Sequence, residues 1–342
     1  MRAACHILTC SLLVWCAAVP AAMAGDDGLS DEKLVELDVL APQKSLSDGD
    51  KAELAKAINV HIKALESDDA EKVSAARKDL AAWSTGVATP VFRGEFSKLA
   101  CQPLSDVVKR AKPLQAINAI EVLRVVRTHE SIKALALLGS NAESPTLNVG
   151  VRLAASRAVL AGIDAGTDMN SAQAEGLVRL LTAAAKSESE WMGALSQLSA
   201  LGSIAKRSGM DAKVVSAARA GQVAGLGAIA AKVGNGDPKN APLLKCASRV
   251  LSAMRLDLAS APSTERSTLS GTLLPVVESL GKAGLAPPAG ADADLAAAYA
   301  DTVKAADLMA QLLKASGKPA AKPAAKPAGK PAAKPAPKKP TN

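Results

Sequence analysis

The stretch "VRLAASRAV", residues 151–159, decides the fold of this 342-residue chain. Its apolar residues recur at the spacing of one helix face, and its alanines are small enough to let a second helix approach closely. Asn148 precedes the stretch and belongs to the residue types that open helices by accepting a hydrogen bond from a backbone N–H group. The stretch therefore predicts a helix that packs tightly against a neighbouring helix.

Related words occur elsewhere in the chain. Residues 73–77 and 215–219 both read VSAAR, and residues 247–251 fit the same template of small residues next to an arginine. We interpret these words as one helix face that recurs in a stack of helix pairs. Coincidence in alanine-rich helices is the alternative interpretation.

The stretch at residues 151–159 resembles the second helix of a repeat in the HEAT and armadillo-type families. The signature positions are Asn148, Val151, Arg152, Ala155 and Arg157. The resemblance implies that the asparagine opens the helix, that valine and alanine face the adjacent repeat, and that arginine helps to tie adjacent loops. The copy at residues 73–77 lacks the preceding Val-Arg pair, and the arginines are unevenly spaced. An irregular helical bundle is therefore the alternative fold.

Helical periodicity continues through most of residues 48–315. Leu54, Ile58, Ile62 and Leu65 form one apolar stripe, for example. Breaks are expected at residues 85–86, 140–145, 162–168, 234–238, 260–262 and 284–290. Aromatic residues make up 2% of the chain and strand formers are scarce, which disfavours all-β and α/β folds. We predict an all-α superhelix, a curved right-handed HEAT-like solenoid of stacked helical hairpins, over residues 48–315.

The two ends of the chain have compositions of their own. Residues 1–24 combine Arg2, an apolar stretch and a small-residue cleavage pattern, which predicts a signal peptide cut before Gly25. A membrane anchor is the alternative there, and we expect no later segment to be long and apolar enough to span a bilayer. Residues 25–47 would be an N-terminal extension. The protein is thus expected outside the cytoplasm, in a periplasm or secreted.

Residues 316–342 form a Lys-Pro-Ala tail that we expect to be disordered, because each proline interrupts helix formation. Its lysines are Lys318, Lys322, Lys326, Lys330, Lys334, Lys338 and Lys339. Removing these and Arg2 from the 41 basic residues leaves 33, equal to the number of acidic residues. The net charge of +8 therefore belongs to the tail and the signal region. The tail is a candidate polyanion-binding segment, and a solubilising spacer is the alternative.

Cys101 and Cys246 are the two cysteines that remain after residues 1–24 are removed. In an oxidising compartment two cysteines can form one disulfide. The alternative is that both are small apolar side chains buried in helices.

Catalytic and metal-binding motifs are weak in this sequence. His61 and His129, with the two cysteines, lack the short spacings of a zinc site, so we predict no metal and no cofactor. Residues 225–230, GLGAIA, resemble a dinucleotide-binding fingerprint but follow a helical rather than a strand pattern. We expect Gly221 and Gly225 to mark a close helix crossing instead.

The sequence as a whole predicts a non-enzymatic exported scaffold that mediates protein–protein interaction through a helical-repeat body. Its partner would be a protein that the sequence does not identify, and no small-molecule substrate is expected. The alternative function is an envelope- or polyanion-binding structural protein that binds an anionic envelope polymer through its cationic tail. An α-helical enzyme is the third and least favoured hypothesis.

Overall fold

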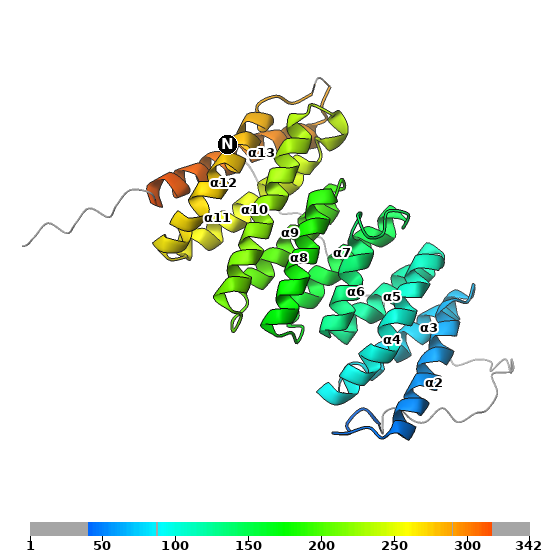
Figure 1. Ribbon diagram of the computed structural model, residues 1–342. Coiled ribbons are helices and arrows are strands. Elements are labelled where there is room, and N and C mark those ends of the chain that lie inside the picture. The colour runs from blue at the N-terminus through cyan, green and yellow to red at the C-terminus, as the bar shows by residue number, and fades with distance from the viewer. Residues whose placement is uncertain (1–39, 87, 289, 317–342) are drawn as a thin grey trace, which may run out of the picture. The chain divides into compact units, whose positions relative to one another are not determined.

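The computed structural model describes residues 40–316 except 87 and 289 (Figure 1). The signal peptide, most of the extension and the seven tail lysines predicted from the sequence lie outside these residues. The helices of the described part are α2 (Asp48–Leu65), α3 (Ala70–Trp83), α4 (Pro90–Arg110), α5 (Pro113–Val126), α6 (His129–Gly139), α7 (Val149–Asp164), α8 (Ser171–Ser187), α9 (Trp191–Lys206), α10 (Ala212–Gly234), η1 (Pro238–Asn240), α11 (Leu243–Ser260), α12 (Ser263–Gly284) and α13 (Ala293–Ser316).

The α-helices pair into hairpins that stack in chain order. Within the described residues the six hairpins are α2/α3, α4/α5, α6/α7, α8/α9, α10/α11 and α12/α13. Each even-numbered helix packs against the next even-numbered helix, and each odd-numbered helix against the next odd-numbered one. The result is two helix layers, and the colours of Figure 1 show the hairpins following one another in chain order. The prediction of an all-α, HEAT- or armadillo-type stack of hairpins is confirmed.

Helix starts follow from local sequence in most of the chain. Ser47, Thr128 and Asn170 each form a reciprocal capping box with the third residue of the helix that follows. Pro113 begins α5, where the missing N–H group costs no intrahelical hydrogen bond. Asp69 caps α3, Ser187 ends α8, and α9 begins after Glu190.

Small residues let α10 pack into the space beside α8 and α9. A Cβ atom added to Gly225 would lie 2.5 Å from Leu198 Cδ2 and 3.3 Å from Ala185 Cβ. One added to Gly221 would overlap Thr182 Oγ1. The expected close helix crossing at these two glycines is confirmed, and Gly225 lies inside a helix rather than in a nucleotide-binding turn.

The expectation that no segment after the signal region is long and apolar enough to span a bilayer is wrong for α10. This helix is long and apolar enough to cross a bilayer, although half of the relevant window is buried inside the fold. It contacts α8, α9, α11 and α12. A helix surrounded by other helices is apolar on several sides, and this packing explains its composition.

The repeated word VSAAR does not mark equivalent positions of the stack. Its first copy lies in α3, an odd-numbered helix, and its second in α10, an even-numbered one. Their arginines also differ, because Arg219 is buried and paired with Glu265 of α12, whereas Arg77 is half-buried. The alternative interpretation, coincidence in alanine-rich helices, accounts for this repeat.

Candidate binding groove

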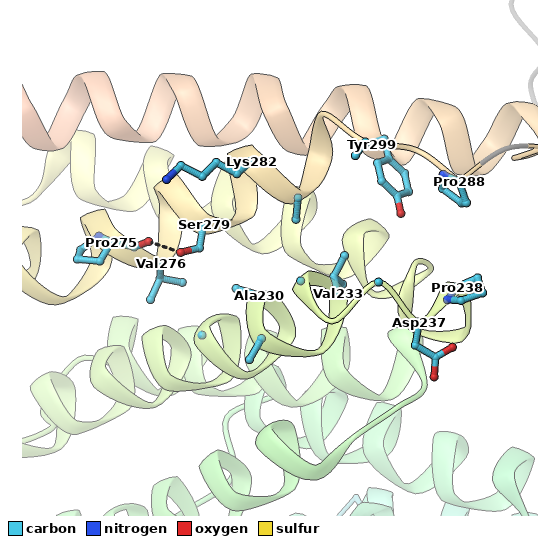
Figure 2. A pocket seen from close by; sticks show the side chains of 16 residues that line it. Ala230, Val233, Asp237, Pro238, Pro275, Val276, Ser279, Lys282, Pro288 and Tyr299 are labelled. Carbon is cyan, nitrogen blue, oxygen red and sulfur yellow. Dashed lines mark hydrogen bonds between the residues drawn. The ribbon is translucent and has the colours of Figure 1, made fainter.

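A groove of about 770 Å³ lies between α10 and α12, next to the start of α13 (Figure 2). One wall consists of small residues from the C-terminal half of α10, and the other comes from α12. The residues that shape it most are Gly227, Ala230, Ala231, Pro275, Val276 and Tyr299. Because most of these side chains are short, neighbouring helices leave an apolar hollow between them.

The α12 wall has a local irregularity. Pro275 lies inside the helix and has no N–H group to donate to the preceding turn. The hydroxyl of Ser279 donates a hydrogen bond of 2.9 Å to the Pro275 carbonyl oxygen, which Figure 2 shows as a dashed line. Opposite, a Cβ added to Gly227 would be in ordinary contact with Val276, at 3.6 Å.

Tyr299 supplies a buried polar group of the groove. Its side chain is buried, and Figure 2 shows its hydroxyl directed toward the C-terminal end of α10. The hydroxyl makes no hydrogen bond to the described residues. Burial raises the pKa of the phenol, so Tyr299 is a neutral donor at pH 7. Lys282 also lines the groove and is exposed.

The predicted signature residues lie in α7 or at its start. Asn148 caps the helix by accepting hydrogen bonds from the N–H groups of Gly150 and Val151, at 2.9 and 3.4 Å. Val151, Arg152 and Ala155 are buried, whereas Arg157 is exposed. Of the five, it is Arg152 that forms a side-chain hydrogen bond and ion pair with a residue outside its own hairpin.

A buried ion pair joins Arg152 to Glu188, which lies between α8 and α9. The guanidinium donates to Glu188 Oε1 at 3.3 Å and to the side chain of Asn141 at 2.7 Å. Glu188 Oε1 also accepts from the backbone N–H groups of Ser189 and Glu190, at 2.9 and 3.0 Å. The two charged side chains are 4% and 0% exposed. Sequence reasoning did not identify Glu188.

Lys232 extends this cluster to the next hairpin. Its ammonium group, on α10, donates a hydrogen bond of 2.5 Å to the backbone carbonyl oxygen of Glu188. Burial lowers the pKa of Lys232, and the charge of Glu188 acts in the opposite direction. Three consecutive hairpins are therefore tied together at one loop.

Cys101 and Cys246 do not form the disulfide considered from the sequence. They lie in α4 and α11, which belong to the second and fifth hairpins of the described residues, and both are buried free thiols. Burial raises the pKa of Cys101 to about 11 and that of Cys246 to about 12. The alternative interpretation, small side chains buried in helices, describes them.

The two histidines lie in different surroundings. His61 is hydrogen-bonded to the Ala57 carbonyl oxygen at 3.0 Å and to Asp79 at 3.2 Å, and its ring meets Trp83 edge-on. His129 begins α6 and lines a second, polar cleft. Within the described ranges no three His, Cys, Asp or Glu side chains are grouped so that they could hold a metal ion.

The odd-numbered helices expose further apolar side chains. Leu114, Val149 and Met192 lie in the first turns of α5, α7 and α9 and are 52%, 45% and 42% exposed. Next to Met192, the indole ring of Trp191 lies 5.0 Å from the guanidinium carbon of Arg249. Single exposed apolar residues are common on protein surfaces, so this set is weaker as a site than the groove.

No protein-family model matches the chain, and no curated protein matches its sequence. Among solved structures, the chain is similar to a designed armadillo repeat protein in complex with the peptide (KR)4. The two chains are 14% identical with a TM-score of 0.38, and the likeness covers 74% of this chain and 99% of the designed one. The fold assignment rests on the hairpin packing described above, because a likeness of this size carries no argument about a ligand.

Proposed function

We propose that this protein is a non-catalytic scaffold that binds a partner protein, and that the groove between α10 and α12 holds a short apolar segment of that partner. The observation that supports this proposal is an apolar hollow in which one buried side chain, Tyr299, presents an unused hydroxyl. Sites of this kind combine apolar contact area with a few polar groups that fix orientation. A backbone carbonyl of the bound segment is the natural acceptor for the hydroxyl.

The polar groups of the groove favour binding over catalysis. The Ser279 hydroxyl donates to a backbone carbonyl, so it is not held by a base that would make it a nucleophile. Asp237 caps η1 by accepting a hydrogen bond of 3.0 Å from the Lys239 N–H group. Figure 2 shows its carboxylate directed away from Tyr299.

The groove can supply a useful but limited part of the binding free energy. Burial of one Val- or Leu-sized side chain contributes about 1.5–3 kcal/mol. Two such residues would therefore contribute about 3–6 kcal/mol before the entropic costs of association. A partner would need further contacts outside the groove for tight binding.

A filled groove tests the proposal directly. Ala231 is exposed on α10 and lines the groove, so Ala231→Trp should block it without disturbing the core. Ala220→Trp is the matched control, because Ala220 is exposed on the same helix about 16 Å away along its axis. A partner captured from an extracytoplasmic extract should be lost with Ala231→Trp and kept with Ala220→Trp. Equal capture by both variants would contradict the proposed site.

The proposal includes export and assigns the lysine tail a secondary role. Amino-terminal sequencing of the mature protein should begin at Gly25 if residues 1–24 are a signal peptide. Deletion of residues 317–342 should leave capture at high salt unchanged. If all capture disappears with the tail or with added salt, the alternative function, binding of an anionic polymer through the tail, is the correct one.

A further inference from the structure

A second cavity, of about 520 Å³, lies where the starts of α4 and α6 meet the loop between α7 and α8. It is separate from the groove at α10 and has a polar lining. Arg93 comes from α4, Arg127 and His129 from the junction of α5 and α6, and Asp168 from the loop. Charged groups from two hairpins and from the α7–α8 loop therefore converge on one cavity.

The backbone at Arg127 has an unusual conformation. This residue caps the C-terminal end of α5 with φ 55° and ψ 31°, in the left-handed region. Among the described residues it is the only one other than glycine with a positive φ. Glycine is the residue that adopts this conformation at a helix end without steric strain. An arginine at this position therefore adopts the left-handed conformation at a steric cost that glycine would not have.

The Arg127 side chain does not offset that cost through contacts in the protein. An arginine at a helix end can bond the last carbonyl oxygens of the helix, but this guanidinium forms no hydrogen bond or ion pair with the described residues. Arg93, which is half-buried, likewise has no ion pair in the described part of the chain. Both guanidinium groups are available to a ligand in the cavity.

His129 lines the cavity with its imidazole ring. Its Nδ1 atom is buried and has no hydrogen-bond partner among the described residues. Burial lowers the pKa of the imidazole, and Lys133 lowers it further, whereas Glu130 raises it. The lowered pKa favours the neutral imidazole, which carries one N–H group.

The walls of the cavity are held in place by hydrogen bonds. Thr128 forms a capping box with Ser131, and its hydroxyl lies 2.5 Å from that of Ser97 in α4. An isolated β-bridge joins the backbone of Thr128 to that of Asp168. The arginine-bearing junction is thus fixed to both neighbouring hairpins before any ligand binds.

The balance of charge selects the kind of ligand. Glu130 and Asp168 line the cavity together with Arg93 and Arg127, so the formal charges cancel when His129 is neutral. A doubly charged phosphate would be repelled by both carboxylates. A singly charged carboxylate is repelled less, and it can accept paired hydrogen bonds from one guanidinium group and a single hydrogen bond from the other.

We propose that this cavity is a binding site for a carboxylate group, which Arg93 and Arg127 hold beside the imidazole ring of His129. The carboxylate belongs to an acidic side chain, to a free C-terminus or to a small organic acid. These sources share the chemistry and differ in size. The site is independent of the groove at α10, so neither proposal depends on the other.

Nuclear magnetic resonance of the full chain tests the site with acetate as the probe. At constant ionic strength, acetate should shift the imidazole signal of His129 in a saturable way. His61, which is already bonded within its own hairpin, should not respond, and neither histidine should respond to acetamide, a neutral molecule of the same shape. Equal responses of both histidines, or none, would overturn the proposal.

Arg127→Gly separates binding from folding. It removes the guanidinium but suits the left-handed backbone, so the urea midpoint should stay the same or rise while the acetate dissociation constant rises at least tenfold. Arg93→Gln should weaken acetate binding to a similar extent. Unchanged acetate binding in Arg127→Gly would show that the arginine is only a helix terminator and would contradict the proposal.

Two further probes identify the ligand. A short peptide ending in a free carboxylate, compared with its C-terminal amide, distinguishes a chain terminus from an acidic side chain. Inorganic phosphate is the competing anion. Saturable binding of phosphate without binding of acetate would overturn the assignment to a carboxylate.

Discussion

Removal of the Glu188 carboxylate should destabilise the protein more than any surface charge would. In Glu188→Ala the Arg152 guanidinium, whose side chain is 4% exposed, would remain buried without its partner. Breaking a buried pair on one side costs about 3–5 kcal/mol. The N–H groups of Ser189 and Glu190 would also lose their acceptor at the start of α9, which places the expected loss toward the upper end of this range.

Urea unfolding followed by circular dichroism measures this loss. The matched control is Glu53→Ala, which removes an exposed i,i+3 pair with Lys56 and should cost less than about 0.5 kcal/mol. Replacement of both partners, Arg152→Met with Glu188→Met, should recover most of the stability, because no buried charge is then left alone. If Glu188→Ala unfolds within about 1 kcal/mol of the unmodified protein, the pair is not as buried as described and the reasoning fails.

Two further predictions follow from packing. Gly225→Ala should destabilise the protein because the new methyl group would lie 2.5 Å from Leu198 Cδ2, whereas Gly271→Ala, with open space around it, should stabilise α12 by up to about 1 kcal/mol; urea midpoints that move in the same direction would contradict this. Cys101 and Cys246 should resist iodoacetamide at pH 8 in the folded protein, because pKa values of about 11 and 12 keep both thiols protonated. Mass spectrometry should detect alkylation after unfolding in urea, and rapid alkylation of either thiol under native conditions would contradict its burial.

The fold could be predicted because its signals are local. Turns near Pro145 and Gly166 carry glycine, proline and polar residues in short clusters, and the helices between them have apolar stripes at helical spacing. The stripe that begins at Leu54 is buried through Leu65, as its spacing predicts. Loops without such residues have weaker signals in the sequence. The α8–α9 connection reads Ser-Glu-Ser-Glu and resembles the capped start of a helix.

The candidate sites could not be predicted because they depend on distant parts of the chain. Glu188 has the sequence surroundings of an exposed acidic turn, and its burial follows from Arg152, 36 residues earlier. Tyr299 faces a groove whose other wall begins at Gly227. Arg127 directly precedes Thr128, a residue type that caps helices, so the sequence indicates a helix start there. The left-handed backbone conformation of Arg127 is visible only in the structure.

Because of the Glu188 cluster, the polar contacts between hairpins differ in strength along the stack. The ion pairs that join the first two hairpins, Arg110 with Glu66 and Lys112 with Asp68, are largely exposed and contribute little. The third and fourth hairpins instead share a buried ion pair, and the part-buried Lys232 joins the fifth hairpin to the same loop. In a protein built of neighbour contacts, such a difference sets where disruption begins. We expect the chain to fray from its amino-terminal hairpins inward, with the middle of the stack melting last and as a block.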